Sequence, residues 1–173
     1  MEVEKKTIYA KKIQHPVMDL FIAASDHGLV FVGTDHSSME DLEANCIKQF
    51  HHCTFIYNDE KRLQPYIIEI VQYLKKERKI FSFPFDINGT PFQLKVWHAL
   101  CNIPYGQTCT YSEIARQIQN PKGVRAVGGA VGSNPLSMII PCHRVIGKNG
   151  ALTGYSGGLD VKKKLLDLEE IPY

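Results

Sequence analysis

The run Pro141-Cys142-His143-Arg144-Val145 has the residue types needed for nucleophilic chemistry. A cysteine attacks electrophiles as its thiolate, and a free thiol with a pKa of roughly 8.5 is mostly protonated at neutral pH unless a base or a positive charge assists it. His143 can supply the base and Arg144 the positive charge. The run therefore predicts a nucleophilic cysteine at Cys142.

Adjacency of Cys142 and His143 does not by itself make a catalytic pair. The apolar run Met138-Ile139-Ile140 before them predicts a strand, and the stretch Gly154-Tyr155-Ser156-Gly157-Gly158 after them predicts a flexible loop. Neighbouring side chains on a strand point to opposite faces, so proton transfer between these two requires a turn or a bridging water. An inert core cysteine beside a surface histidine is the alternative that this run leaves open.

Two short helices are expected upstream of this run. Thr110-Tyr111-Ser112-Glu113 has the pattern of a capping box that opens a helix, and Asn120-Pro121-Lys122-Gly123 ends it. A second helix is predicted from Val124 to Asn134, where Pro135 stops it. Two helices joined by a short glycine-containing turn predict a helix-turn-helix.

The second of these helices is rich in glycine. Gly128, Gly129 and Gly132 each cost about 1 kcal/mol relative to alanine within a helix. Close packing against a neighbouring helix would require such small residues. Close approach to a nucleic-acid groove, with Arg125 as the only long side chain, would require them as well.

Together these features resemble the O6-alkylguanine-DNA alkyltransferase family, also called methylated-DNA–protein-cysteine methyltransferases. The resemblance is dense from Gly89 to Glu169 and loose in the first half of the chain. Its motifs, in order, are Gly89-Thr90-Pro91-Phe92-Gln93, Val96-Trp97, Ile103-Pro104-Tyr105-Gly106, Tyr111-Ser112, Arg125-Ala126-Val127-Gly128, Asn134-Pro135, the Pro141–Val145 run and Gly154-Tyr155-Ser156-Gly157-Gly158-Leu159.

The resemblance implies that Cys142 accepts the alkyl group of O6-alkylguanine and keeps it as a thioether, so that one molecule acts once and needs no cofactor. His143, acting through a water, and Glu169 would form a relay that draws the proton from the thiol. Tyr111 would donate to the guanine ring as it leaves. Asn134 would brace the cysteine region by hydrogen bonding.

The resemblance also implies the residues that contact DNA and the extruded base. The DNA-contacting residues would be Arg125, Ala126, Gly128 and Tyr111. The base pocket would be formed by the backbone carbonyl of Val145 together with Tyr155, Ser156 and Gly157. Chemistry on a base in a duplex requires its extrusion, and Arg125 would fill the gap from the minor groove. The resemblance therefore implies double-stranded DNA that contains O6-alkylguanine as the partner, and it leaves open whether O4-alkylthymine is also a substrate. We expect the protein to be a monomer.

Structural alternatives exist for several of these residues. Tyr111 can simply pack at a helix start, Asn134 can cap a helix before Pro135, and Glu169 can be a solvated carboxylate. Glu170 lies next to Glu169, and a shift of one residue would exchange their roles. Core packing is the expected role of an apolar set at helical spacing, formed by Phe92, Val96, Trp97 and Leu100.

Charge is unevenly distributed along the 173 residues, whose formal net charge is only +2. Residues 1–89 contain 11 Lys and Arg against 13 Asp and Glu, whereas residues 90–173 contain 9 against 5. The half with the motifs is thus the basic one. This modest excess predicts weak, salt-sensitive and non-specific DNA affinity from a few phosphate contacts.

The first half of the chain predicts a scaffold without chemistry. Strands are expected at 7–13, 18–24 and 29–33, and helices at 38–50 and 63–77. The predicted class is α+β, in which a ribonuclease-H-like antiparallel sheet with helices precedes a helical domain with a winged helix-turn-helix. We expect the domains to span residues 1–85 and 86–173, joined near Pro84.

The five cysteines are Cys46, Cys53, Cys101, Cys109 and Cys142. An odd number without a secretory signal predicts a reduced intracellular protein, cytoplasmic or, in a eukaryote, nuclear. No segment is long enough to span a membrane. The only metal-like cluster combines Cys46 and Cys53 with His51 and His52, and its wide cysteine spacing predicts no metal site.

Three functional classes fit the sequence. The first is a single-turnover DNA repair transferase, which the motifs favour. The second is a non-catalytic lesion-binding relative, which typically lacks a cysteine at position 142. The third is a helix-turn-helix regulator, but such proteins read bases with long polar side chains, and the glycine-rich helix has almost none.

Overall fold

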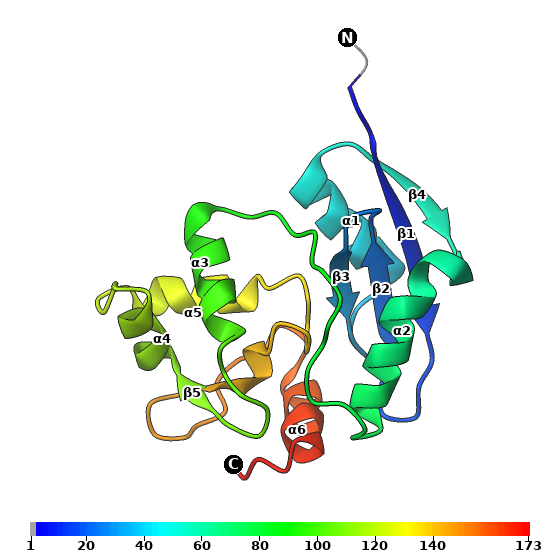
Figure 1. Ribbon diagram of the computed structural model, residues 1–173. Helices are drawn as coiled ribbons and strands as arrows, with labels where there is room; N and C mark the ends of the chain where they lie inside the picture. Colours follow the sequence, from blue (N-terminus) through cyan, green and yellow to red (C-terminus); the bar gives the residue numbers. More distant parts are fainter. Residues whose placement is uncertain (1–2) are drawn as a thin grey trace. The chain divides into compact units, whose positions relative to one another are not determined.

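The computed structural model describes residues 3–173 and separates the chain into two compact units (Figure 1). The first unit ends at Asn88, and the second spans Gly89–Tyr173. Within the described residues, no helix combines the length and the apolar character that crossing a bilayer requires.

The first unit is built on a four-stranded sheet with the order β3-β2-β1-β4. Its strands are β1 (Lys6–Ile13), β2 (Leu20–Ala24), β3 (Leu29–Gly33) and β4 (Cys53–Tyr57). Strands β1 and β2 are antiparallel, as are β2 and β3, in agreement with the antiparallel arrangement predicted for these three strands. Every residue of β2 and β3 is buried, which is why these strands have continuous apolar sequences.

Strand β4 was not predicted, and it makes the sheet mixed rather than antiparallel. It pairs in parallel with β1, placing Lys6 opposite Cys53 and Ala10 opposite Tyr57. The parallel direction of β4 follows from the path of the chain. Strand β3 runs parallel to β1, and the helical connection between β3 and β4 brings the chain back so that β4 runs in the same direction. The residues Cys53–Tyr57 are mostly β-branched or aromatic, a signal that the nearby His51-His52-Cys53 cluster obscured.

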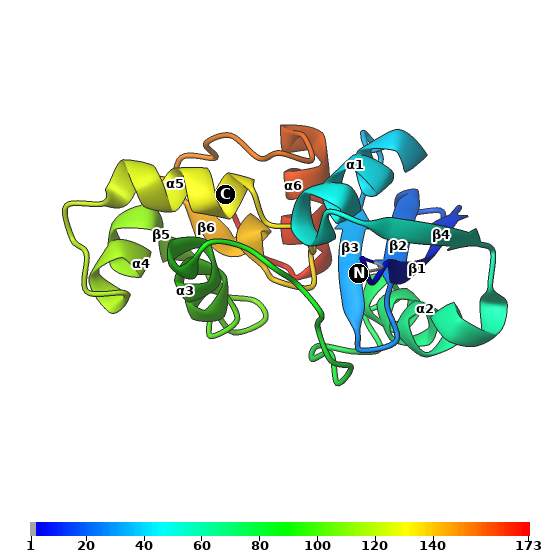
Figure 2. The same ribbon diagram turned by 90° about the horizontal axis from the view of Figure 1, so that it is seen from above.

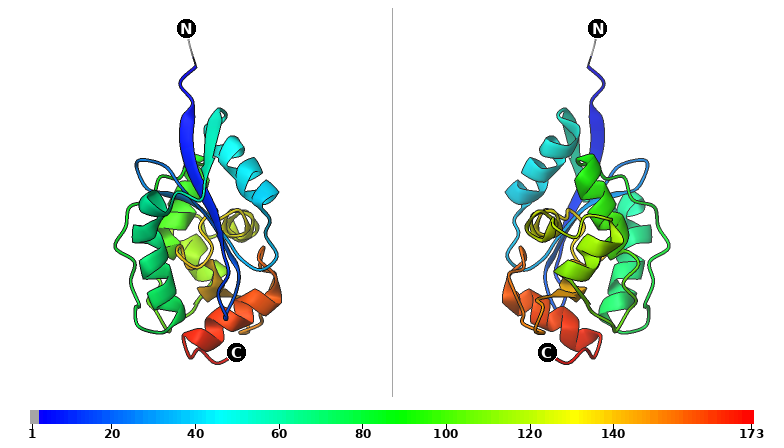
Figure 3. Two further views of the ribbon diagram at one scale, coloured as in Figure 1. Left: turned by 90° about the vertical axis from the view of Figure 1, so that its right-hand side faces the viewer. Right: turned by 90° about the vertical axis from the view of Figure 1, so that its left-hand side faces the viewer.

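Two helices cover opposite faces of this sheet (Figures 2 and 3). Helix α1 (Met39–Phe50) begins at Ser38, which forms a capping box with Asp41. Its Leu42 and Cys46 pack on one face in a core cluster with Ile8, Phe21 and Val30.

Helix α2 (Glu60–Leu74) begins and ends three residues earlier than predicted. Asp59 caps it by accepting from the amide of Arg62, and Pro65 lies within the helix. A side-chain cap satisfies amides that the first turn leaves open, so Asp59 rather than the apolar Leu63 marks the start.

The segment after α2 adds to the free edge of β3. Leu29 donates its amide to the carbonyl of Pro84 (3.0 Å), and Asp86 donates to the carbonyl of Leu29 (2.8 Å). Gly28 allows this approach, because a Cβ there would lie 2.6 Å from the Pro84 oxygen. The segment thereby covers a sheet edge that would otherwise expose unpaired backbone groups.

The second unit is mainly helical. Helix α3 (Pro91–Leu100) buries Val96, Trp97 and Leu100 as predicted and leaves Phe92 half-buried. The indole nitrogen of Trp97 donates to the Ala130 carbonyl at 2.8 Å, which ties α3 to helix α5 (Val124–Gly132).

Helix α4 (Tyr111–Gln117) starts at the predicted capping box, with Thr110 and Glu113 reciprocally hydrogen-bonded. Residues 118–123 connect α4 to α5 and complete the helix-turn-helix. Two short parallel strands, β5 (Cys109–Thr110) and β6 (Val145–Ile146), join the start of α4 to the segment after Cys142. The C-terminal helix α6 (Leu159–Leu168) packs against that segment.

Candidate functional site

Cys142 begins a single 3-10 turn, η1 (Cys142–Arg144), rather than following a strand. The strand predicted over Met138–Ile140 is wrong: these residues form a turn in which Met138 has a φ of 63°. A 3-10 turn rotates successive side chains by about one third of a revolution, so those of neighbouring residues point in different directions. All three residues of η1 are buried.

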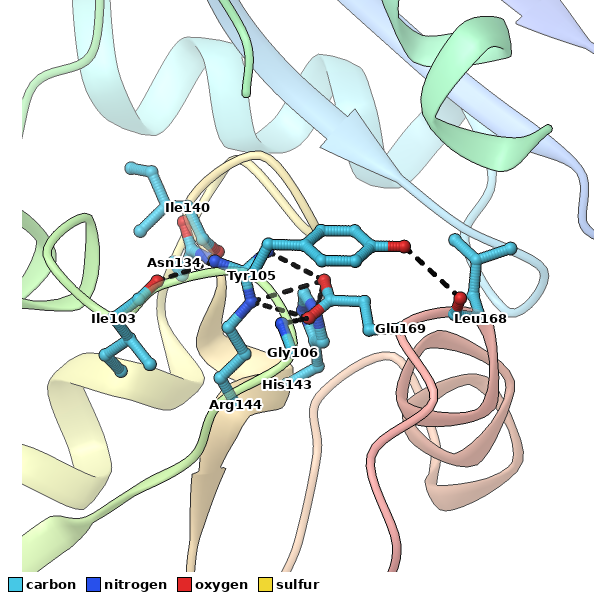
Figure 4. Close-up of polar contacts among 9 residues, drawn as sticks. All are labelled: Ile103, Tyr105, Gly106, Asn134, Ile140, His143, Arg144, Leu168 and Glu169. Carbon is cyan, nitrogen blue, oxygen red and sulfur yellow. Dashed lines mark hydrogen bonds and ion pairs between the residues drawn. The ribbon is translucent and has the colours of Figure 1, made fainter. Parts of the chain in front are cut away.

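The Glu169 carboxylate is the centre of a buried polar cluster (Figure 4). It accepts from Nε2 of His143 (2.8 Å) and, bidentately, from Nε and Nη2 of Arg144 (2.9 and 2.7 Å). Arg144 also donates to the Ile103 carbonyl at 2.7 Å, and the Gly106 amide donates to the carboxylate at 3.1 Å. A buried carboxylate needs such partners to remain ionised.

Gly106 can reach this cluster because of its backbone conformation. Its φ of 79° lies in the left-handed region that glycine adopts without strain. The amide thereby points at a carboxylate 63 residues later in the chain. Together with the bond from Arg144 to the Ile103 carbonyl, this contact joins the Ile103-Pro104-Tyr105-Gly106 segment to the cluster beside Cys142.

The pairing with Glu169 fixes the tautomer of His143. A carboxylate only accepts, so Nε2 carries the hydrogen and Nδ1 is left with a lone pair in the neutral ring. Burial lowers the pKa of His143, with Glu169 opposing the shift, so the ring is neutral at neutral pH. Nδ1 is buried and has no hydrogen-bond partner among the residues described. The ring is therefore prepared to accept a proton at Nδ1.

The Cys142 thiol lies in surroundings that both suppress and assist its ionisation. Burial raises its pKa, whereas the nearby polar side chains of Asn134 and Tyr155 and the positive charge of Lys162 lower it. The pKa remains above the ordinary value, so the resting group is a thiol that requires a base. The neighbouring His143 ring has the free nitrogen that such a base needs.

Asn134 holds the backbone that leads to Cys142. Its Nδ2 donates to the carbonyls of Ile140 (2.8 Å) and Leu136 (3.3 Å), and its Oδ1 accepts from the Leu136 amide. The helix cap that the sequence offered as an alternative is instead Ser133. Asn134 thus braces the irregular backbone of this turn, together with the bond from the Ile140 amide to the Leu136 carbonyl.

Lys162 is a buried cation that sequence reasoning missed. Its side chain is fully buried, and its ammonium group donates to the Val145 carbonyl at 2.6 Å and the Thr153 carbonyl at 3.4 Å. It is the first of three consecutive lysines, and Lys163 and Lys164 are exposed. The amphipathic spacing of α6, with Val161 and Leu165 also buried, was the available signal.

An open cavity of about 390 Å³ lies over the helix-turn-helix. It is lined by Tyr111, Ser112, Val124, Arg125, Gly128, Lys148, Thr153 and Gly154. Three of the predicted site residues, Tyr111, Arg125 and Gly128, therefore meet at one cavity. Its basic side chains, Arg125 and Lys148, are both exposed.

The glycines of α5 face open space. A Cβ added to Gly128, Gly129 or Gly132 would meet no atom within 4 Å. Close packing within the chain, one of the two explanations that the sequence left open, therefore does not require them. Arg125 and Ala126 are exposed on the same helix. The small residues leave a smooth helical surface beside the cavity.

Comparison with known protein families covers both units. Residues 8–87 match the ribonuclease-like domain of 6-O-methylguanine DNA methyltransferase, and residues 91–171 match its DNA binding domain. The chain belongs to the 6-O-methylguanine DNA methyltransferase family.

Individual relatives agree with this membership. An inducible methylated-DNA–protein-cysteine methyltransferase of Bacillus subtilis is 49% identical over 170 residues, covering 98% of this chain and 94% of the relative. The crystal structure of the Mycobacterium tuberculosis O6-methylguanine methyltransferase matches with a TM-score of 0.80 at 36% identity, covering 94% of this chain and 93% of the other. That enzyme has also been solved in complex with DNA, and this structure matches with a TM-score of 0.79.

As a 6-O-methylguanine DNA methyltransferase, the chain repairs DNA by transferring an alkyl group to a cysteine. The fold has the two parts that the resemblance implied, a ribonuclease-like domain and a DNA-binding domain. The first is α+β with a mixed sheet, and the second contains the helix-turn-helix.

The structure brings many, but not all, of the predicted methyltransferase residues together. Glu169 is the glutamate that contacts His143, while Glu170 is exposed. Val145 is buried, and Tyr155 is half-buried near the thiol, whereas Ser156 is exposed and Gly157 is half-buried. These last four do not line the 390 Å³ cavity.

The metal-like cluster of the first unit remains without a metal-binding geometry. Cys46 is buried in the core, and Cys53 donates to its carbonyl at 3.5 Å. Burial raises the pKa of Cys46 to about 12, so it stays a thiol. Among residues 3–173, no three His, Cys, Asp or Glu side chains are grouped in a way that could hold a metal ion.

Proposed function

We propose that Cys142 is the cysteine that accepts the alkyl group, and that it does so once per molecule. The observation that supports this most directly is the buried His143–Glu169 pair beside it, whose free Nδ1 provides a base. A thioether has no low-energy route back to a thiol, so each molecule is consumed.

The proposed activation step moves the thiol proton away from Cys142. A water between the thiol and Nδ1 of His143 accepts the proton from sulfur and passes one to the ring. The imidazolium that forms is stabilised by Glu169, whose charge is in turn held by Arg144. The thiolate then attacks the carbon bonded to the guanine oxygen. This arrangement follows the logic of a nucleophile, a base and a third group that orients the base.

The base pocket is proposed to combine backbone and side-chain groups around Cys142. The Val145 carbonyl contacts the guanine, Tyr155, Ser156 and Gly157 form the wall, and Tyr111 donates to the ring as it leaves. Lys162 supports this pocket by holding the Val145 carbonyl in place.

The DNA surface is proposed to be the exposed side of α5. Arg125 enters the base stack where the flipped nucleotide was, and the surface formed by Ala126 and the glycines lies against the minor groove. Small residues allow a helix to approach this narrow groove closely, and extrusion needs a side chain to fill the gap. The open space around the glycines supports this proposal.

The cellular setting is proposed to be the reducing cytoplasm, or the nucleus in a eukaryote. All five cysteines are free in the structure, and a repair cysteine must remain reduced to react. We also propose that a monomer acts on each lesion.

The acceptor can be tested with duplex DNA that contains O6-[³H-methyl]guanine. We expect the label to plateau at one methyl group per protein molecule and to map to Cys142 by peptide mass spectrometry. Cys142→Ser should abolish transfer, whereas the matched variants Cys101→Ser and Cys109→Ser should retain it. Label that persists in Cys142→Ser, or that maps to another cysteine, would refute the assignment.

A further inference from the structure

The side chain of Thr153 contacts the proposed proton donor. Its hydroxyl donates to the phenol oxygen of Tyr111 at 3.3 Å, and both residues line the 390 Å³ cavity. Tyr111 is the first residue of α4, whereas Thr153 lies in the loop before α6, so the bond joins segments 42 residues apart in sequence. Hydrogen bonds at reaction centres are often long before substrate binds and shorten in the complex.

Two contacts restrict the conformation of Thr153, although its side chain is exposed. A Cβ built on Gly147 would lie 3.3 Å from the Thr153 methyl, so this methyl group packs directly against Gly147. A β-branched side chain has few χ1 choices, so placing the methyl there directs the hydroxyl to Tyr111. The backbone of Thr153 is held as well, because the buried Lys162 ammonium donates to its carbonyl.

We propose that Thr153 is a positioning residue that directs the phenol proton of Tyr111 toward the departing guanine. The phenol oxygen accepts from Thr153, so its own hydrogen is free to point into the cavity. The same bond supports the negative charge that develops on that oxygen during donation. This inference rests on the proposed role of Tyr111.

The proton balance of the step is simple. As the bond from Sγ to the alkyl carbon forms, the carbon–oxygen bond breaks and its electron pair goes to the guanine oxygen. The guanine ring takes the phenol proton, and Thr153 keeps its own proton while its hydrogen bond to the phenolate strengthens. The phenolate later regains a proton from water.

The test is a double-mutant cycle on Tyr111→Phe and Thr153→Val. Valine keeps the branched shape and the backbone carbonyl that Lys162 holds, and it removes only the hydroxyl. The rate of alkyl transfer is measured in single turnover with saturating duplex DNA, alongside DNA affinity. We expect Thr153→Val to slow transfer about three- to ten-fold, the loss of one hydrogen bond, with unchanged DNA affinity.

Two further variants make the result specific. Thr153→Ser keeps a hydroxyl but lacks the methyl group that orients it, so it should recover part of the rate that Thr153→Val loses. In the Tyr111→Phe background, Thr153→Val should have no further effect, because the group it positions is absent. A packing role for Thr153 would not produce this coupling.

The donor role of Tyr111 and the positioning role of Thr153 are overturned by different results. A Tyr111→Phe protein that reacts at the normal rate would overturn the donor role of Tyr111, and this inference with it. A slow Tyr111→Phe with a normal Thr153→Val would overturn the inference alone. Equal slowing by Thr153→Val with and without the phenol hydroxyl would also overturn the inference alone.

Discussion

The second unit contains two regions built on opposite principles, the buried cluster around Glu169 and the exposed surface of α5. In the cluster, one carboxylate accepts from a histidine, an arginine and a backbone amide, and it is almost fully buried. On α5, three glycines have no neighbour within 4 Å of an added Cβ. The polar groups of the first region are hydrogen-bonded to one another, whereas the glycines of the second region face open space.

The difference separates chemistry from recognition. A proton relay requires fixed distances and a low dielectric, which only a buried and fully paired cluster provides. A surface that approaches DNA must leave space for its partner, even at a cost in helix stability. Substitutions in the cluster should therefore lower stability or the rate of transfer. Substitutions that fill the space beside the α5 glycines should stabilise the helix but weaken DNA binding.

The largest expected effect comes from breaking the cluster at Arg144. Arg144→Met leaves the buried Glu169 charge without its bidentate partner, so we expect the free energy of unfolding to fall by about 3–5 kcal/mol. Urea denaturation measures this. Arg116→Met, on the exposed side of α4, is the control and should change stability by less than about 0.5 kcal/mol. A loss as small as that for Arg144→Met would show that the cluster contributes little to stability.

A smaller effect, on rate rather than folding, is expected from removing the base. Burial lowers the pKa of His143, so its ring stays neutral down to a more acidic pH than an ordinary histidine. The transfer rate of the unmodified protein should therefore be nearly constant around pH 7 and fall only at lower pH, where the ring becomes protonated. His143→Ala should react about 100-fold more slowly at pH 7. Its rate should then rise with pH, because the pKa of Cys142 is raised and hydroxide must replace the base.

Rate–pH profiles and DNA affinity measured together test this relay. DNA affinity should remain nearly unchanged in His143→Ala. Glu169→Gln should slow transfer as well, and the double variant should lose little beyond the worse single one, because the two residues act as a unit. Glu170→Gln is the matched control, since its side chain is exposed. Parallel profiles for His143→Ala and the unmodified protein would exclude His143 as the base.

The smallest effect is expected on α5, where stability and binding should change in opposite directions. Gly129→Ala should raise the free energy of unfolding by up to about 1 kcal/mol, because it improves helix propensity and meets no atom. Duplex affinity, measured by fluorescence anisotropy, should fall several-fold. His98→Ala on the exposed part of α3 serves as a control for a helix substitution elsewhere. Unchanged affinity in Gly129→Ala would place the DNA on another surface.

Local signals in the sequence were sufficient for much of the fold. The capping box at Thr110 predicted the start of α4, because it involves residues three apart, and the start expected for α1 at residue 38 lies one residue before Met39. Strand β4 was missed because the adjacent His51-His52-Cys53 cluster obscured the strand signal of its residues, and its pairing with β1 joins residues far apart in sequence. The Met138–Ile140 strand was wrong because a buried turn held by Asn134 is as apolar as a strand.

The residues of the candidate site also divide into those that local sequence patterns indicate and those that only the folded chain identifies. The Cys142 run and the glycine-rich helix were readable from residue types alone. Distinguishing Glu169 from Glu170 required the end of α6, where Glu169 is the cap and Glu170 turns away with a φ of 58°. Lys162 was hidden in a row of three lysines, because only the helical phase shows which of them enters the core.

The raised pKa of Cys142 also bears on what the protein does while no lesion is present. Oxidants and soluble electrophiles react with thiolates that are exposed, and Cys142 is 3% exposed and protonated at rest. As the proposed acceptor, which would be used only once, Cys142 is therefore withheld from the many small molecules that could consume it. The low reactivity of the buried thiol in the absence of a lesion is therefore as much a feature of this site as its proposed reactivity toward an alkylated base.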